Sequence, residues 1–290
     1  MSRLLVTGGA GFLGRHLVEA LVSRGHEVTV FDRAPSSPVL ETRVVQGDLG
    51  DRVALANVIR DHDAVYHLGG FADLNAAKTR PLDTVQTNIL GTVNLLEAMR
   101  EVGVSRLLFA STAYVYSREG GFYRCSKQAC ESYIEEHARM FGTRYTVIRY
   151  GSLYGPRADA SNGVYRLLRE AMTEGKISYA GAPDDLREYI HVEDAARLSA
   201  DLLDPSHEQQ HVMLTGPNPT RAAELFMMFQ EILGRRIDVE YRRTEGGGHY
   251  AVTPYAFTPR PGRKLSTNHY VDMGQGLLRM IEDLHRELES

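Results

Sequence analysis

Short apolar runs alternate with helix-like segments through the first half of the chain. The runs predict buried strands near residues 3–6, 27–31, 43–47, 64–68, 106–110 and 145–150. Between them apolar residues recur at helical spacing, as Leu13, Leu17 and Leu21 do after the first run. Repeated strand–helix units form parallel sheets with right-handed crossovers and helices on both faces. We therefore predict an α/β fold built on a doubly wound parallel sheet.

The second half of the chain follows a different rhythm. Its predicted elements are a loop at 151–157, a helix near 164–173, a strand at 187–192, a helix from Glu193, a helix at 221–233, a long Gly/Pro/Tyr-rich loop at 244–264 and a last helix near 273–287. We interpret residues 1–150 as a first domain and 151–290 mainly as a smaller α/β cap that forms a cleft with it. The segment near 187–200 is a candidate to return to the first domain.

A glycine-rich turn joins the first predicted strand to the first helix, over Thr7–Gly14. Gly8 allows the chain to turn tightly, Gly11 lets the backbone approach a pyrophosphate, and Gly14 lets the helix pack on the strand. The free N–H groups and the positive end of the helix would then meet the phosphates. The glycines are spaced three and three, unlike the two-and-three spacing of the common dinucleotide fingerprint.

An acidic residue follows at the distance that a dinucleotide site requires. The second strand ends at Asp32, about 20 residues past the loop, where a carboxylate can accept from a ribose 2′-OH. This order of elements favours a Rossmann-type dinucleotide-binding domain over a purely structural turn. The fourth strand ends at Gly69 and Gly70, where a cofactor can pass close to the backbone, although a plain turn explains this pair equally well.

The composition is that of an ordinary globular protein. Of 290 residues, 43% are hydrophobic and 24% charged, and the net charge of −4 does not indicate a nucleic-acid partner. No apolar run approaches the ~20 residues that span a bilayer, and the chain begins with its first strand rather than a signal peptide. Cys125 and Cys130 share one predicted helix, which disfavours a disulfide and favours a reduced, cytoplasmic setting. The 11 histidines are scattered, and no metal site is predicted.

Tyr123 and Lys127 lie four residues apart in a predicted helix that runs to about residue 140. Side chains at this spacing share one face. A nearby ammonium lowers a phenol's pKa from its usual ~10, so that the tyrosine can take a proton from a hydroxyl group. Ser111 and Thr112 end the fifth strand, where a hydroxyl is placed to hydrogen-bond the substrate oxygen. The alternatives are a solvated helix pair and a simple strand-end turn.

These residues belong to a longer set of segments that resembles the extended short-chain dehydrogenase/reductase family, in its NAD-dependent nucleotide-sugar epimerase/dehydratase branch. The matching segments are Thr7–Gly14, Asp32, Asp48–Leu49, His67–Gly70, Asn88, Gly91–Glu97, Ser111–Tyr116, Tyr123 with Lys127, Arg149–Pro156 and Arg187–Asp194. They extend from residue 3 to about residue 196, and they are far more specific for the family than for its substrate.

The resemblance implies a cofactor site for NAD. The pyrophosphate is held by Gly8, Gly11, Phe12, Leu13 and Gly14, the adenosine ribose by Asp32, the adenine by Asp48 and Leu49, and the nicotinamide ribose by Lys127. Arg33, Leu68, Gly69, Gly70 and Tyr123 complete the candidate set. NAD is expected rather than NADP because Asp32 would repel a 2′-phosphate, whereas the adjacent Arg33 would favour one.

The resemblance also implies a substrate site, with Tyr123 as the base. Its candidate residues are Phe71, Thr112, Ala113, Tyr114, Ser152, Arg157 and Arg187. Arg187 matches the arginine that grips the substrate diphosphate, a role that suits a guanidinium group. Its alternative role is a surface ion pair with Glu188 or Asp185.

Three departures from the family pattern bear on the reaction. The Asp-Glu pair of the 4,6-dehydratases is Ala113-Tyr114 here, which disfavours dehydration. Only residues 117–122 separate Tyr116 from Tyr123, so one wall of the substrate cleft is trimmed. The Asn before the Tyr-Gly-Pro of the family is Ser152.

We therefore expect an NAD-dependent nucleotide-sugar epimerase, acting at C4, that oxidises the hydroxyl, lets the keto sugar rotate and returns the hydride to its other face. The alternatives are a nucleotide-sugar reductase or dehydrogenase with net redox, and a non-catalytic NAD-binding sensor, which the presence of Tyr123 and Lys127 disfavours. The expected partners are a nucleotide-diphosphate sugar and a second copy of the chain, packed through the helices near 85–100 and 124–140, with no nucleic acid or membrane.

Overall fold

The computed structural model describes residues 1–33, 42–117 and 119–242. The chain divides into two compact units, Met1–Phe257 and Thr258–Ser290, and all that follows concerns the first. The loop expected at 244–264 and the helix expected near 273–287 lie outside the described residues.

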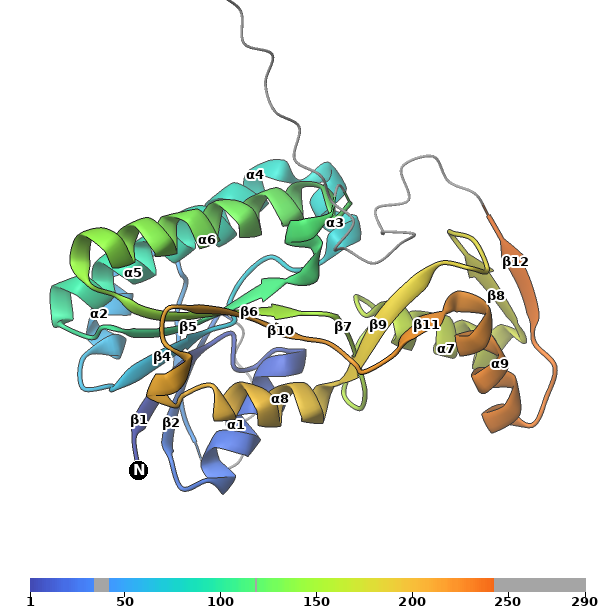
Figure 1. Ribbon diagram of the computed structural model, residues 1–290, viewed down its shortest axis with the longest axis horizontal. Helices are drawn as coiled ribbons and strands as arrows, with labels where there is room; N and C mark the ends of the chain where they lie inside the picture. The colour runs from blue at the N-terminus through green and yellow to red at the C-terminus, as the bar shows by residue number, and fades with distance from the viewer. Residues whose placement is uncertain (34–41, 118, 243–290) are drawn as a thin grey trace, which may run out of the picture. The chain divides into compact units, whose positions relative to one another are not determined.

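A seven-stranded sheet forms the centre of the first unit (Figure 1). In spatial order its strands are β10 (Gln210–Leu214), β6 (Arg144–Tyr150), β5 (Arg106–Thr112), β4 (Ala64–His67), β1 (Arg3–Thr7), β2 (Glu27–Asp32) and β3 (Arg43–Gln46). All six pairings are parallel. The order reverses between β1 and β4, and such a switch point is where open α/β sheets bind ligands. The structure confirms the predicted Rossmann-type doubly wound sheet.

Helices cover both faces of this sheet because alternate residues of each strand point to opposite sides. Leu4 and Val6 pack with α1 (Phe12–Ser23) and α8 (Val192–Asp201). Leu5 faces the other way, into a cluster with α2 (Arg52–Ile59), α5 (Gly91–Val102) and α6 (Gly121–Phe141). Strands buried on both faces need continuous apolar runs, and such runs located six of the seven strands. The edge strand β10 was not predicted, because only Leu214 at its end is fully buried.

The helix expected near residues 85–100 is not a single α-helix, and helical structure already begins at Pro81. It consists of α4 (Pro81–Asp83), a π-helical stretch over Thr84–Leu90 and then α5. The wider π turns contain Asn88, whose buried side chain bonds to two other segments. Such π stretches often occur at functional sites, and apolar periodicity does not reveal them.

The second half of the described chain builds two small sheets. One contains β11 (Pro219–Arg221), β9 (Leu186–His191) and β7 (Ser152–Tyr154), and the other contains β12 (Asp238–Tyr241) and β8 (Lys176–Tyr179). Helices α7 (Gly163–Glu174) and α9 (Ala222–Leu233) pack around Phe226 and Phe229 in a separate apolar cluster. We call this region the cap. Between its segments the chain returns to the large sheet as α8 and β10.

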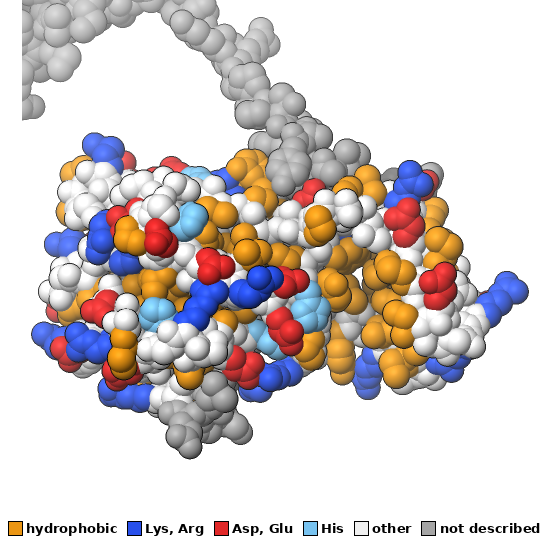
Figure 2. Space-filling view, turned by 60° about the horizontal axis from the view of Figure 1, so that its bottom comes forward, with side chains coloured by type: hydrophobic (Ala, Val, Ile, Leu, Met, Phe, Trp, Pro, Cys, Tyr) orange, Lys and Arg blue, Asp and Glu red, His pale blue; other side chains and the backbone are white. Residues whose placement is uncertain are grey.

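Charges on the face that carries α1 and α8 are mixed in sign (Figure 2). Several form ion pairs, such as Arg24 with Asp201 at 2.8 Å and Arg197 with Asp194 at 2.8 Å. A face of this kind lacks the single-signed field that attracts a nucleic-acid backbone.

Candidate active site

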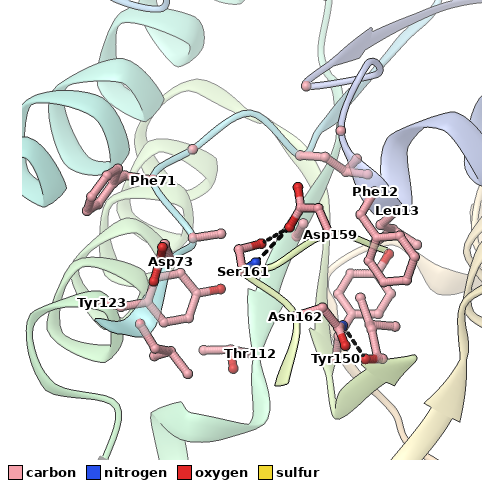
Figure 3. A pocket seen from close by; sticks show the side chains of 18 of the residues that line it. Phe12, Leu13, Phe71, Asp73, Thr112, Tyr123, Tyr150, Asp159, Ser161 and Asn162 are labelled. Carbon is pink, nitrogen blue, oxygen red and sulfur yellow. Dashed lines mark hydrogen bonds between the residues drawn. The ribbon is translucent and has the colours of Figure 1, made fainter. Parts of the chain in front are cut away.

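One large cleft, with a volume of about 1100 Å³, runs along the carboxyl edge of the large sheet and onto the cap. Figure 3 shows part of it, with Tyr123 reaching in from α6 and residues 159–162 of the cap across from it. The predicted site residues that line the cleft are Gly8, Gly11, Phe12, Leu13, Gly14, Asp32, Arg33, Asp48, Leu49, Leu68, Gly69, Gly70, Phe71, Thr112, Tyr114, Tyr123, Lys127, Ser152 and Arg187. Ala113 and Arg157 are not in its lining.

The glycine loop is packed too tightly for side chains at two of its positions. A Cβ atom on Gly8, whose φ is 71°, would lie 2.5 Å from the backbone nitrogen of Gly69. A Cβ atom on Gly14 would lie 2.2 Å from the carbonyl oxygen of Gly8. These contacts bring the end of β1, the start of α1 and the end of β4 into one tight surface. Gly11 is the N-cap of α1, so the loop leads directly into the helix N-terminus.

Asp32 contributes to the same surface from the end of β2. One of its carboxylate oxygens accepts a hydrogen bond of 3.0 Å from the backbone N–H of Ala10 in the glycine loop. Asp48, beyond the end of β3, accepts from the backbone N–H of Gly50 at 2.7 Å and lines the cleft together with Leu49. The adjacent strand ends thus place two carboxylates beside the loop, and these residues fit a dinucleotide.

The catalytic candidates meet where β5 ends and α6 begins. Lys127 is buried, and its ammonium donates a 2.7 Å hydrogen bond to the carbonyl oxygen of Ala110. It lies 4.6 Å from the ring centroid of Phe109 and 6.0 Å from that of Tyr123. The hydroxyl of Thr112 accepts a 3.3 Å hydrogen bond from the backbone N–H of Tyr114. A phenol, a hydroxyl and an ammonium therefore converge on one end of the cleft.

The expected lowering of the Tyr123 pKa by Lys127 is not found. Burial raises the pKa of the Tyr123 phenol above its usual value, and burial lowers the pKa of the Lys127 ammonium. The lysine bonds to the backbone of β5, so its charge is not directed at the phenol oxygen. Residue spacing predicted the shared helix face correctly, whereas this bond depends on the tertiary structure.

A buried asparagine that we had not assigned to the site holds the cleft wall in place. The Asn88 side-chain oxygen accepts from the backbone N–H of Phe71 at 2.6 Å, and its amide donates to the carbonyl oxygen of Phe71 at 3.1 Å. The same amide donates to the hydroxyl of Ser126 at 2.8 Å, which donates to the carbonyl oxygen of Tyr123 at 2.8 Å. Asn88 thus connects two residues of the cleft, and its place among the segments that match the family pattern was the signal available in the sequence.

His67, at the end of β4, plays a comparable part under the glycine loop. Its Nδ1 lies 2.7 Å from the Thr7 hydroxyl oxygen and its Nε2 lies 3.1 Å from that of Thr92. The Thr7 oxygen also accepts from the backbone N–H of Gly69 at 3.2 Å. Burial, assisted by the nearby Lys127 charge, lowers the pKa of His67 to about 3. A neutral imidazole therefore connects the strand ends on which the loop rests.

Of the two arginines that the sequence assigned to the substrate site, Arg187 lines the cleft and Arg157 does not. Arg187 on β9 is only 6% exposed and donates to the Tyr179 hydroxyl at 3.2 Å. Arg157 instead pairs with Glu19 of α1 at 2.6 Å. Arg166, in the first half of α7, lines the cleft although we had not predicted it.

The cap wall also includes a hydrogen-bonded turn that we had not predicted, formed by Asp159, Ser161 and Asn162. Asp159 accepts from the backbone N–H of Ser161 at 2.8 Å and from its hydroxyl, and these bonds lower the pKa of the Asp159 carboxyl. Asn162 caps α7 by accepting from the N–H of Tyr165 at 3.1 Å. The N-terminus of α7 is therefore held at the cleft.

Cys125 and Cys130 are both free thiols. Within the described ranges, no group of His, Cys, Asp or Glu side chains is arranged to hold a metal ion. In that same part of the chain, every helix is too short or too polar to cross a membrane.

Known proteins with several activities are similar to this chain. The solved UDP-glucose 4-epimerase of Thermotoga maritima, in complex with UDP-glucose, is 28% identical, with a TM-score of 0.77 over 85% of this chain and 87% of that one. A dTDP-glucose 4,6-dehydratase of Mycobacterium tuberculosis is 27% identical over 87% of this chain and 85% of its own length. A UDP-glucuronate 4-epimerase of Thermodesulfobacterium geofontis is 25% identical over 83% and 84%.

A sequence model of one protein family matches residues 4–214 of this chain. The matched range includes the glycine loop, Asp32, Tyr123, Lys127 and Arg187. Apart from Arg3 at the start of β1, that range contains the strands of the large sheet and the whole lining of the cleft. Sequence, fold and site agree, and the chain belongs to the NAD dependent epimerase/dehydratase family.

Proposed function

We propose that this protein is an NAD-dependent nucleotide-sugar epimerase that acts at C4 of the sugar. The observation that carries the proposal is the convergence of Tyr123, Thr112 and Lys127 at the end of a cleft that also contains the glycine loop. A base beside a dinucleotide site is the arrangement needed to oxidise a hydroxyl group. Residues 113–114, where dehydratases of the family are expected to carry Asp-Glu, are Ala113 and Tyr114 here, which favours epimerisation over loss of water.

The residues of the chain provide the proton chemistry. Bound NAD would take up a hydride from the sugar and give it back. Tyr123 receives the proton of the reacting hydroxyl, and Thr112 holds the same oxygen by a hydrogen bond. Because burial raises the pKa of Tyr123, its phenolate needs a positive charge nearby. The Lys127 ammonium, 6.0 Å from the centroid of the Tyr123 ring, is the cation of this chain that lies beside it.

Asp32 supports NAD rather than NADP. Its carboxylate is held against the glycine loop by the N–H of Ala10, where a ribose 2′-OH can donate to it and a 2′-phosphate would be repelled. Arg33 also lines the cleft and is the residue that would oppose this preference.

The cap supplies the cations for a diphosphate. Arg187 and Arg166 both line the cleft, and the N-terminus of α7 adds free N–H groups. Arg157 was the second arginine expected from the sequence, but its ion pair with Glu19 directs it to α1. We therefore assign the diphosphate to Arg187 with Arg166.

A homodimer fits the exposed apolar residues of α6 and the preceding helices. Val85 and Leu90 of the π-helical stretch, and Tyr133, Met140 and Phe141 of α6, are all exposed although large and apolar. Apolar side chains that gather on neighbouring helices mark a surface for association. Light scattering on the purified protein should give twice the chain mass, and Tyr133→Glu combined with Met140→Glu should give the monomer.

The epimerase proposal is tested by anaerobic incubation of the purified protein with UDP-, GDP- and dTDP-sugars. We expect one sugar to be converted to its C4 epimer, with NAD copurified and no net NADH. Stoichiometric NADH or a keto sugar as final product would favour the net oxidoreductase, and a 6-deoxy-4-keto product would show a dehydratase. Binding without any turnover would favour the sensor.

A further inference from the structure

We propose that the sugar end of the cleft selects a neutral sugar and rejects a uronic acid, with Asp73 as the selecting residue. This inference rests on the epimerase function proposed above. It distinguishes between the substrates of two relatives, because the Thermotoga maritima enzyme was solved with UDP-glucose and the Thermodesulfobacterium geofontis protein is a UDP-glucuronate epimerase.

Asp73 lies on the cleft wall that also carries Tyr123 (Figure 3). One of its carboxylate oxygens accepts from the backbone N–H groups of Asn75 at 2.9 Å and Ala76 at 3.0 Å, which makes it the N-cap of α3 (Leu74–Thr79). The segment that leads to it is fixed by the two hydrogen bonds between Asn88 and the backbone of Phe71. The carboxylate is therefore held in a defined position at the end of the cleft where the sugar reacts.

Two of the basic side chains on this wall have partners of their own. Arg80 stacks on the ring of Phe71, 5.0 Å from its centroid, and forms an ion pair with Asp83. The Lys127 ammonium donates to the carbonyl oxygen of Ala110. Lys78 lines the cleft on the last turn of α3, where it is exposed to solvent that screens its charge.

The cap wall adds another negative charge. Hydrogen bonds from Ser161 lower the pKa of the Asp159 carboxyl, so this group stays ionised at neutral pH. The cap arginines are assigned to the diphosphate, and a uronate carboxylate would have to compete with that group for them. Like charges in a partly desolvated site repel strongly enough to decide between substrates.

The reaction itself carries the C6 group past Asp73. For hydride to return to the other face, the keto sugar must turn over while C4 stays near Tyr123. This rotation exchanges the sides on which C3 and C5 lie, so the C6 substituent on C5 faces each wall in one of the two poses. A carboxylate at C6 therefore approaches Asp73 in one pose, whichever way the substrate first binds, whereas a neutral hydroxymethyl group can donate a hydrogen bond to it.

The test compares the dissociation constants of UDP-glucose and UDP-glucuronate by calorimetry, with the full chain loaded with NAD. Wild type should bind UDP-glucose at least about tenfold more tightly, and Asp73→Asn should reduce that ratio by about tenfold, because the amide keeps the helix cap and loses the charge. Asp51→Asn is the matched control, since Asp51 is also a helix N-cap, accepting from the backbone N–H of Ala54 in α2 outside the cleft lining, and it should leave the ratio unchanged.

Equal affinity for the two sugars in wild type, tighter binding of UDP-glucuronate, or an unchanged ratio in Asp73→Asn would overturn the selection by Asp73. None of these results would affect the epimerase proposal, which is read from turnover of the sugar panel. If the protein binds neither sugar, the selection by Asp73 falls, and the epimerase proposal is still decided by turnover of the UDP-, GDP- and dTDP-sugars.

Discussion

The two walls of the cleft are built in different ways. One wall, which we call the cofactor wall, consists of the glycine loop and the strand ends around it. Gly8 packs against the backbone of Gly69, Asp32 accepts a hydrogen bond from Ala10, and His67 is hydrogen-bonded to two threonines. The cap wall consists of side chains from a strand, a turn and the first half of a helix, such as Arg187 on β9 and Arg166 on α7. The cofactor wall therefore tolerates little change, whereas the cap wall is where this chain can differ from relatives that act on other sugars.

Of the substitutions considered, Tyr123→Phe should reduce activity most, because it removes the proton acceptor and leaves both walls of the cleft intact. We expect turnover to fall by about 10³-fold, the usual size of a general-base contribution, with NAD affinity within about twofold of wild type by calorimetry. Tyr133→Phe, on the exposed part of the same helix, is the control and should keep full activity. Near-normal turnover by Tyr123→Phe would remove Tyr123 from the mechanism.

The second-largest effect is expected from Arg187→Ala, which should affect the function of the cap wall and spare that of the cofactor wall. Loss of this nearly buried guanidinium should weaken nucleotide-sugar binding by about 2–4 kcal/mol, as when one side of a desolvated charge pair is removed, with NAD affinity nearly unchanged. Arg157→Ala should change the Michaelis constant little, because Arg157 pairs with Glu19 away from the cleft. A larger effect at Arg157 than at Arg187 would reverse our assignment.

Gly14→Ala should instead distort the glycine loop of the cofactor wall. Its Cβ would lie 2.2 Å from the Gly8 carbonyl oxygen, so the loop must shift, at a cost of about 1–3 kcal/mol. We expect weaker NAD binding in fluorescence titration and a lower melting temperature. A Cβ on Gly163, at the start of α7, meets nothing within 4 Å, so Gly163→Ala should bind NAD normally. Normal NAD affinity in Gly14→Ala would contradict the tight-loop account.

The smallest expected effect is on how the free energy of unfolding depends on pH. His67 is neutral in the folded protein because its pKa is about 3, below the ~6.5 of an unfolded histidine. Unfolded chains therefore bind an extra proton below pH ~6.5, so this contribution to stability is complete above that pH and is lost as pH falls towards 3. Between pH 7 and 5 the free energy of unfolding should drop by about 1–2 kcal/mol more in wild type than in His67→Gln. Equal drops in denaturant titrations would show that His67 is not held neutral.

The sequence placed the glycine loop, Asp32 and Gly69 at one edge of the sheet, because each follows or ends a strand and parallel strands end at one edge. The sequence could not predict which of Arg157 and Arg166 faces the cleft. That choice depends on the path of the loop between them, which periodicity does not describe. Nor could the sequence show that Lys127 bonds to Ala110, or that the helix from Pro81 widens around Asn88. These features depend on neighbours that are distant in the chain, and periodicity does not encode them.

The central claim is that a hydride leaves C4 of the sugar and returns to it within one active site. The most direct measurement follows a deuterium atom at C4 of whichever nucleotide sugar the purified protein converts, in ordinary water. We predict that the epimer forms with the deuterium still at C4 and without accumulation of NADH. Loss of the deuterium to water, or its recovery in free NADH, would contradict the account.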